Sequence, residues 1–185
     1  MKPFLSIIIP AYNEAKRVPL TLIDIDKRLS ERDYSYEIIV VSDGSIDSTA
    51  EIVNRLSKII KNLRLIDNSE NHGKGWVVRQ GMLSAKGNWR LFTDADNSTS
   101  IDQFDQMVPF FSAGGGSAFG RKDSYDIVIG SRAIKGARLE PPQPFLKRIL
   151  GKLGNLIIQI MLLKGFKDTQ CGFKVFSEED RKSVV

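Results

Sequence analysis

The sequence predicts an α/β fold in which a mostly parallel central sheet is flanked by helices. Before Gly114, short apolar runs rich in isoleucine and valine alternate with longer segments of helical periodicity. Polar residues follow the end of each apolar run, and ligands bind at that edge of the sheet in layered folds of this kind. Both observations favour strands and helices that alternate along one chain.

Four apolar runs are predicted as strands of this sheet: 4–10, 36–42, 63–68 and 89–93. The first two are compact and rich in β-branched residues, as expected for strands that are buried on both faces. A further strand is predicted at 126–130, after a glycine-rich stretch at 114–120 whose composition is typical of a flexible surface loop.

Helices are predicted between these strands at 17–31, 48–61, 73–85 and 100–111. Ser48 and Ser100 are suitable N-cap residues, because a serine hydroxyl can accept a hydrogen bond from a free N–H group of the first turn. No internal repeat is evident. With 185 residues, of which 42% are hydrophobic, the chain is expected to form a single domain, 1–185.

The segment 144–165 is predicted as an amphipathic helix. Its apolar residues recur at helical spacing, and lysine, arginine and asparagine occupy much of the opposite face. It is too short and too often interrupted by polar residues to span a bilayer. A helix buried in the core is one interpretation. The basic flank favours the other, a helix that lies in the membrane interface.

Composition limits the other classes of function. The net charge is +5, and from Arg132 to Lys167 eight basic residues accompany one acidic residue, Glu140. These bases border leucine and isoleucine rather than aromatic side chains, so an anionic membrane surface is the better partner and nucleic acid is not expected. The single cysteine, Cys171, excludes an internal disulfide and favours a reduced, cytosolic compartment. No signal peptide or transmembrane segment is predicted.

Asp94 and Asp96 follow the predicted strand 89–93 directly. Residues two apart in an extended segment point to the same side, so both carboxylates can face one spot. Two carboxylates that leave room for water and phosphate oxygens suit Mg²⁺ or Mn²⁺ with a bound diphosphate. Turn-forming or solvated aspartates are the alternative interpretation, because this spacing alone is weakly specific.

The other strand ends also bear polar residues. Asp43 lies in a Ser-Asp-Gly-Ser turn, where its carboxylate could accept a hydrogen bond from a base N–H such as that of uracil, or could serve only the turn. Residues 71–75, Asn-His-Gly-Lys-Gly, combine a lysine with a helix start, which suits an anion. Neither a P-loop nor a Gly-x-Gly-x-x-Gly motif is present, so a dinucleotide cofactor is unsupported.

Together these residues resemble family 2 glycosyltransferases with the GT-A fold, a Rossmann-like fold of nucleotide-diphospho-sugar transferases. The motifs that carry the resemblance occur in order at 10–14, 41–45, 71–75, 93–96, 130–132 and 168–174. The Gly-Lys-Gly element and the sequence Asp-Thr-Gln-Cys-Gly-Phe-Lys at 168–174 are most similar to polyprenyl-phosphate glycosyltransferases, particularly dolichyl-phosphate β-glucosyltransferases. The resemblance implies metal-assisted, inverting transfer of glucose from UDP-glucose, or mannose from GDP-mannose, to a lipid phosphate at the cytoplasmic side of a membrane.

The resemblance also implies roles for particular residues. Those expected to hold the nucleoside are Pro10, Tyr12, Glu14 and Asp43. Asp94 and Asp96 would hold the metal and the diphosphate. Lys74 and Arg132 would meet phosphates of the donor or acceptor, and Asp168 would lie near the acceptor.

The sequence departs from the family pattern in three ways. Ser42 stands where many relatives have an aspartate, and Trp76 stands where a small residue is commoner. The chain also ends soon after Phe176, which suggests a C-terminally truncated domain. A truncated, inactive relative that binds nucleotide or membrane is therefore an alternative. A sugar-nucleotide pyrophosphorylase is less favoured, because such enzymes begin with a glycine-rich phosphate loop and residues 6–14 contain no glycine.

Overall fold

The computed structural model describes residues 2–111, 125–131 and 171–179. The strands in these ranges are β1 (Leu5–Ala11), β2 (Tyr36–Asp43), β3 (Leu63–Asn68), β4 (Trp89–Thr93), β5 (Ile127–Ile129) and β6 (Phe173–Ser177). The helices are α1 (Val18–Leu29), α2 (Thr49–Leu56), α3 (Lys74–Ser84), α4 (Gln103–Met107) and the 3-10 turn η1 (Val108–Phe110). Residue contacts divide the chain into two units, 1–128 with 173–185 and 129–172.

The strands form one sheet in the order β3-β2-β1-β4-β6-β5. Strands β1 to β4 run parallel, whereas β6 pairs antiparallel with β4. The chain winds outward from β1 to β3 and then returns to place β4 on the other side of β1. In open α/β sheets, a crevice forms where the winding reverses in this way, at the carboxyl ends of the strands.

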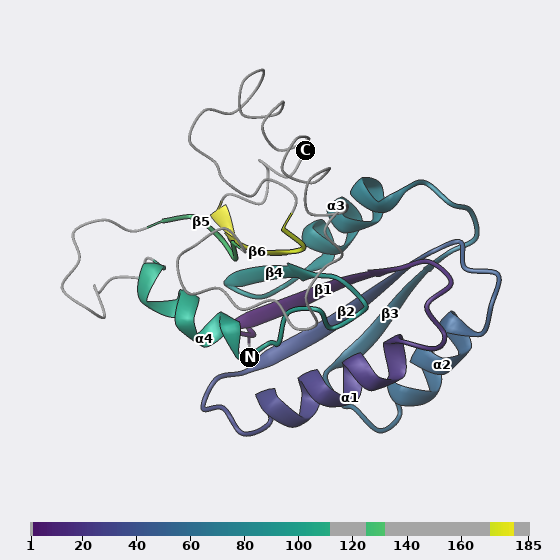
Figure 1. The fold of residues 1–185 in the computed structure, drawn as a ribbon, viewed down its shortest axis with the longest axis horizontal. Coiled ribbons are helices and arrows are strands. Elements are labelled where there is room, and N and C mark those ends of the chain that lie inside the picture. The colour runs from purple at the N-terminus through teal and green to yellow at the C-terminus, as the bar shows by residue number, and fades with distance from the viewer. Residues whose placement is uncertain (1, 112–124, 132–170, 180–185) are drawn as a thin grey trace, which may run out of the picture. The chain divides into compact units, whose positions relative to one another are not determined.

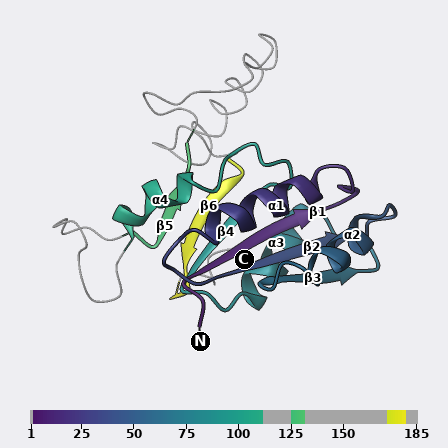
Figure 2. The same ribbon diagram turned by 90° about the horizontal axis from the view of Figure 1, so that it is seen from below.

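Helices cover both faces of the parallel part of the sheet. Helices α1 and α2 lie on one face and α3 lies on the other (Figures 1 and 2). Under α3, Ile8 of β1 packs in a buried cluster with Val77 and Met82 of the helix. Ile7 and Ile9 alternate with Ile8 along β1, so they face the opposite side, and all three are completely buried. This two-sided burial explains why β1 and β2 are almost continuously apolar.

The predicted parallel strands and intervening helices are confirmed, but several helices are shorter than predicted. The segment 100–111 forms α4 and η1 in place of one helix. Asp102, rather than Ser100, occupies the N-cap position, and the Ser100 hydroxyl is hydrogen-bonded to the Asp102 carboxylate at 3.2 Å. Ser48 occupies the N-cap position of α2, as predicted. Its side chain makes no capping bond, but its carbonyl accepts the Ile52 N–H at 3.0 Å.

Among the described residues, strand β6 was not predicted from the sequence. Strand β6 alternates buried and half-buried residues, with Phe173 and Val175 facing the core. The alternation of apolar and polar residues from Phe173 onward was the available signal. The strand predicted at 126–130 is confirmed as β5. The predicted loop at 114–120 and the helix at 144–165 lie outside the described residues. Within those described, no helix has the length and apolar character needed to cross a bilayer.

Candidate active site

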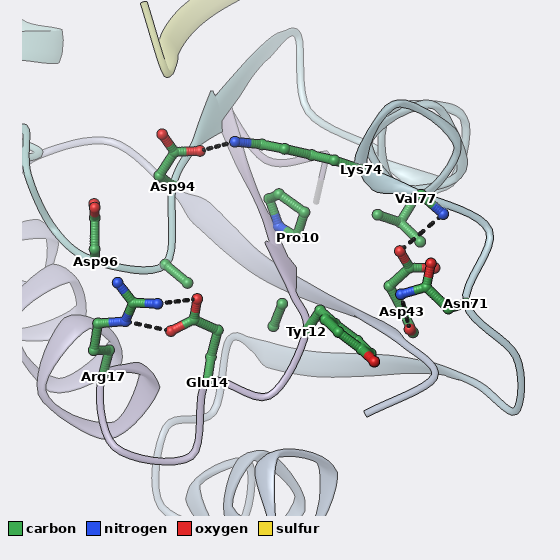
Figure 3. Close-up of a pocket in the computed structure, with 13 residues that line it drawn as sticks. Pro10, Tyr12, Glu14, Arg17, Asp43, Asn71, Lys74, Val77, Asp94 and Asp96 are labelled. Atoms are coloured by element: carbon green, nitrogen blue, oxygen red, sulfur yellow. Dashed lines mark hydrogen bonds and ion pairs between the residues drawn. The ribbon is translucent and has the colours of Figure 1, made fainter. Parts of the chain in front are cut away.

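A cavity of about 410 Å³ lies at the carboxyl ends of β1, β2 and β4. Its lining comes from the end of β1 and the following loop, the last residue of β2, the start of α3 and the loop after β4 (Figure 3). The predicted site residues in this lining are Pro10, Tyr12, Glu14, Asp43, Lys74, Asp94 and Asp96. The fold therefore brings together residues that lie as far as 86 positions apart in the chain (10 to 96).

The loop after β1 is fixed to the loop after β2 by hydrogen bonds. The Asn13 side chain accepts the Ile46 N–H at 2.9 Å, and the main-chain N–H of Glu14 donates to the Thr49 hydroxyl at 2.8 Å. Asp47 accepts the Ala15 N–H at 3.2 Å. Burial acts to raise the pKa of Asp47, but its bonds to Thr49 and Ala15 outweigh burial and hold that pKa below the usual value. The loop after β1, which carries Tyr12, is thus joined to the loop after β2 by these hydrogen bonds.

Asp43 organises the start of α3. Its side chain is buried, and its two carboxylate oxygens accept the main-chain N–H groups of His72 at 2.8 Å and Gly73 at 3.0 Å. Each oxygen keeps further acceptor capacity, so these bonds leave room for a base N–H. Gly44 follows with φ of +68°, and a Cβ there would lie 2.6 Å from the carbonyl carbon of Glu70. Only glycine allows the two loops to approach this closely.

Lys74 reaches from the first turn of α3 to the loop after β4. Its Nζ lies 2.6 Å from an oxygen of Asp94 (Figure 3) and 5.4 Å from the centre of the Phe92 ring. Asp94 therefore already faces a positive charge inside the cavity. This ion pair shows that a cation can approach the carboxylate, and that a divalent ion would compete with Lys74 for it.

Asp96 lies two residues further along and is exposed. Its carboxylate accepts the Ser98 N–H at 3.0 Å, and Asn97 between them has a positive φ of 52°. In Figure 3, the side chains of Asp94 and Asp96 extend in the same general direction from the loop.

Glu14 and Arg17, which both line the cavity, form a two-pronged ion pair with each other. The Nε and Nη2 atoms of Arg17 lie 2.5 and 2.6 Å from the two oxygens of Glu14 (Figure 3). Arg17 lines the cavity, but the sequence analysis did not select it. Its place three residues after Glu14, just before a helix start, was the available signal.

The residues present fit a divalent cation that is bound together with a diphosphate. Among the described residues, no group of three or more His, Cys, Asp and Glu side chains could hold a metal ion. Mg²⁺ and Mn²⁺ nevertheless bind well to one or two carboxylates when phosphate oxygens and water complete the shell. Asp94 and Asp96 provide two such carboxylates. Arg132 and Asp168, the other predicted catalytic residues, lie outside the described part of the chain.

The chain is similar in sequence to known glycosyltransferases over nearly all its length. The sequence model of glycosyl transferase family 2 matches residues 6–180. A dolichyl-phosphate beta-glucosyltransferase of Dictyostelium discoideum is 36% identical over 98% of this chain and 56% of its own length. The enzyme of the same name from Saccharomyces cerevisiae is 34% identical over 94% and 54%, respectively. The chain thus spans about half the length of these curated relatives.

Solved structures agree on the fold. The mannosyltransferase PcManGT from Pyrobaculum calidifontis, in complex with GDP-Man and Mn²⁺, matches with a TM-score of 0.62 at 19% identity, over 100% of this chain and 47% of its own. Glucosyl-3-phosphoglycerate synthase from Mycobacterium tuberculosis, with Mn²⁺, UDP-glucose and phosphoglyceric acid, matches with a TM-score of 0.64 at 18% identity, over 96% and 57%. The predicted GT-A fold is confirmed, and with its match over 6–180 the chain belongs to glycosyl transferase family 2.

Proposed function

We propose that this chain transfers glucose from UDP-glucose to dolichyl phosphate or a related polyprenyl phosphate. The observation that supports this most is that one cavity is lined by the acidic pair, Asp94 and Asp96, and also by Lys74, Tyr12 and Asp43. The names of the curated relatives indicate the lipid acceptor and the sugar. The comparisons do not favour an inactive relative or a pyrophosphorylase.

The nucleoside would bind between the loops after β1 and β2. Tyr12 is half exposed at the cavity, so its ring is free to pack against a base, while Pro10 forms part of the adjoining wall. Asp43 would accept the N–H of the base, in addition to the main-chain groups that it already holds. Guanine also offers an N–H at its pairing edge, so GDP-mannose is the second candidate donor.

The reaction would be a displacement at the anomeric carbon of the sugar. An oxygen of the lipid phosphate forms the new bond, the bond to the diphosphate oxygen breaks, and attack from the opposite side inverts the configuration. A cation held by Asp94 and Asp96 would act as a Lewis acid toward the negative charge that gathers on the diphosphate. Lys74 would direct further positive charge at the diphosphate, and Arg132 would do the same. The acceptor phosphate is already anionic near neutral pH, so no strong general base is required.

We further propose that the segment 144–165 holds the chain at the cytoplasmic face of a membrane, with Asp168 close to the acceptor. Charge reversal of three of its basic residues, Lys147, Arg148 and Lys152, should then weaken binding to vesicles that contain anionic lipid. Unchanged co-sedimentation with such vesicles would contradict this assignment.

A turnover assay with a matched pair of variants tests the activity. The purified chain should form glucosyl polyprenyl phosphate from UDP-glucose with Mn²⁺ or Mg²⁺, and Asp96→Asn should abolish product formation. Asp67→Asn is the control, since Asp67 is an exposed aspartate of β3 outside the cavity. Full turnover by Asp96→Asn would refute the proposed site. Binding of UDP with no turnover by the native chain would instead favour the inactive relative.

A further inference from the structure

The loop that bears the acidic pair is attached to helix α1 at two points. The first is Thr21, which is almost fully buried and donates from its hydroxyl to the main-chain carbonyl of Ala95 at 2.8 Å. Ala95 is itself buried and stands between the two aspartates. The bond thus fixes the peptide group between Ala95 and Asp96.

The second attachment is Asp24, one turn further along the same helix. One of its oxygens accepts the side-chain N–H of Asn97 at 3.0 Å, and the other accepts the Arg28 Nε–H at 2.8 Å. The Asn97 amide, together with Arg28 and against the effect of burial, holds the pKa of Asp24 below its usual value. Asn97 has a φ of 52°, a left-handed conformation that asparagine tolerates better than most residues.

These two contacts bracket Asp96. Thr21 fixes the residue before it and Asp24 fixes the residue after it, so the backbone that presents its carboxylate is held on both sides. Groups that orient metal-binding carboxylates without touching the metal commonly control affinity, because they reduce the rearrangement that binding requires.

We propose that Thr21 and Asp24 are positioning residues that set the geometry of the Asp94–Asp96 pair before metal and diphosphate bind. The inference rests on the proposed function only in assigning metal and diphosphate to that pair. This positioning role predicts that the loop is already ordered in the metal-free protein. It also predicts that metal and diphosphate bind more tightly than they would without the two contacts to α1.

Two variants and their partners test this. Thr21→Val keeps the shape of the side chain but removes the hydroxyl, and Thr21→Ser restores a hydroxyl. Asp24→Ala removes the bond to Asn97 of the loop and also the bond to Arg28 within α1. Its control is Asp26→Ala, because Asp26 lies on the same helix and its carboxylate accepts the Tyr36 hydroxyl of β2 at 2.7 Å.

In the metal-free protein, hydrogen exchange of the amides of residues 95–98 should quicken about fivefold in Thr21→Val and Asp24→Ala, as expected for the loss of one hydrogen bond. By calorimetry, the affinity for UDP in the presence of Mn²⁺ should fall about tenfold in both variants. Thr21→Ser and Asp26→Ala should bind like the native chain. Should Thr21→Val fail to fold, Asp24→Ala against Asp26→Ala decides the question, since the Asp24 carboxylate is partly exposed.

The inference is overturned if Thr21→Val and Asp24→Ala exchange and bind as the native chain does, or if Asp26→Ala weakens binding equally. An Asp96→Ala variant separates this from a failure of the proposed function. If Asp96→Ala abolishes Mn²⁺-dependent binding of UDP while the α1 variants do not affect it, only the positioning role falls. If Asp96→Ala binds normally, the metal site and the positioning role fall together.

Discussion

Replacing Lys74 with glutamine should change the affinities for metal and for nucleotide in opposite directions. In the ligand-free protein, the Lys74 ammonium lies 2.6 Å from Asp94 and so occupies a position that a divalent ion would need. Its removal frees that carboxylate for Mn²⁺. It also removes a positive charge that the proposed mechanism directs at the diphosphate.

The exposure of the pair sets the size of the first effect. The side chains of Lys74 and Asp94 are 61% and 31% exposed, and ion pairs of this kind contribute about 0–1 kcal/mol. The affinity for Mn²⁺ alone should therefore rise by no more than about fivefold. A hydrogen bond from a charged group to phosphate contributes about 1.5–3 kcal/mol, so the affinity for UDP with Mn²⁺ should fall about ten- to hundredfold.

Calorimetric titrations with Mn²⁺ alone, and with UDP at saturating Mn²⁺, measure both effects. Lys74→Arg keeps the charge and should retain most of the UDP affinity. Lys58→Gln, at an exposed position outside the cavity, controls for the change in net charge. A fall in Mn²⁺ affinity in Lys74→Gln, or UDP binding equal to that of the native chain, would refute this reasoning.

Two further predictions concern stability. Gly81→Ala would place a Cβ 2.5 Å from Ile8 in the core under α3. The cost of overpacking, about 1–3 kcal/mol, should exceed the helix-propensity gain of about 0.5–1 kcal/mol, so Gly81→Ala should lower Tm by a few degrees. In the control Gly75→Ala, the new Cβ meets no atom within 4 Å and should not lower Tm. A Gly81→Ala protein as stable as the native chain would contradict the packing. Glu37 has a pKa below its ordinary value of 4.5, since its hydrogen bonds outweigh the opposing effect of burial. The stabilisation that the Glu37 carboxylate contributes is therefore full above about pH 4.5 and is lost as the pH falls through the lower pKa of the folded state. In urea unfolding, the excess free energy of unfolding of the native chain over Glu37→Gln should shrink only below about pH 4.5. An excess that does not change with pH would exclude this role.

The sequence alone was sufficient for the layered fold and for seven residues that line the cavity, although it did not select Arg17. Strands β1 and β2 are buried on both faces, so their apolar character is visible without any knowledge of their neighbours. Parallel strands also place their carboxyl ends at one edge, so the polar residues after β1, β2 and β4 could be assigned to a common site from their order in the chain. Asp94 and Asp96 were selected from the two-residue period of an extended segment, but β4 ends at Thr93 and Ala95 and Asp96 lie in a turn, so that period does not place the pair.

Tertiary structure decided the contacts that no local pattern specifies. Strand β6 adds to β4 across about 80 residues, and its pairing depends on an available strand edge rather than on its own five residues. Other contacts between residues far apart in the chain are those of Lys74 and Asp43 with their partners, the approach of Gly44 to the next loop and the attachment of Asn97 to α1. Sequence periodicity records which side of an element is buried, whereas the partner of a polar side chain is set by the packing of whole elements against one another.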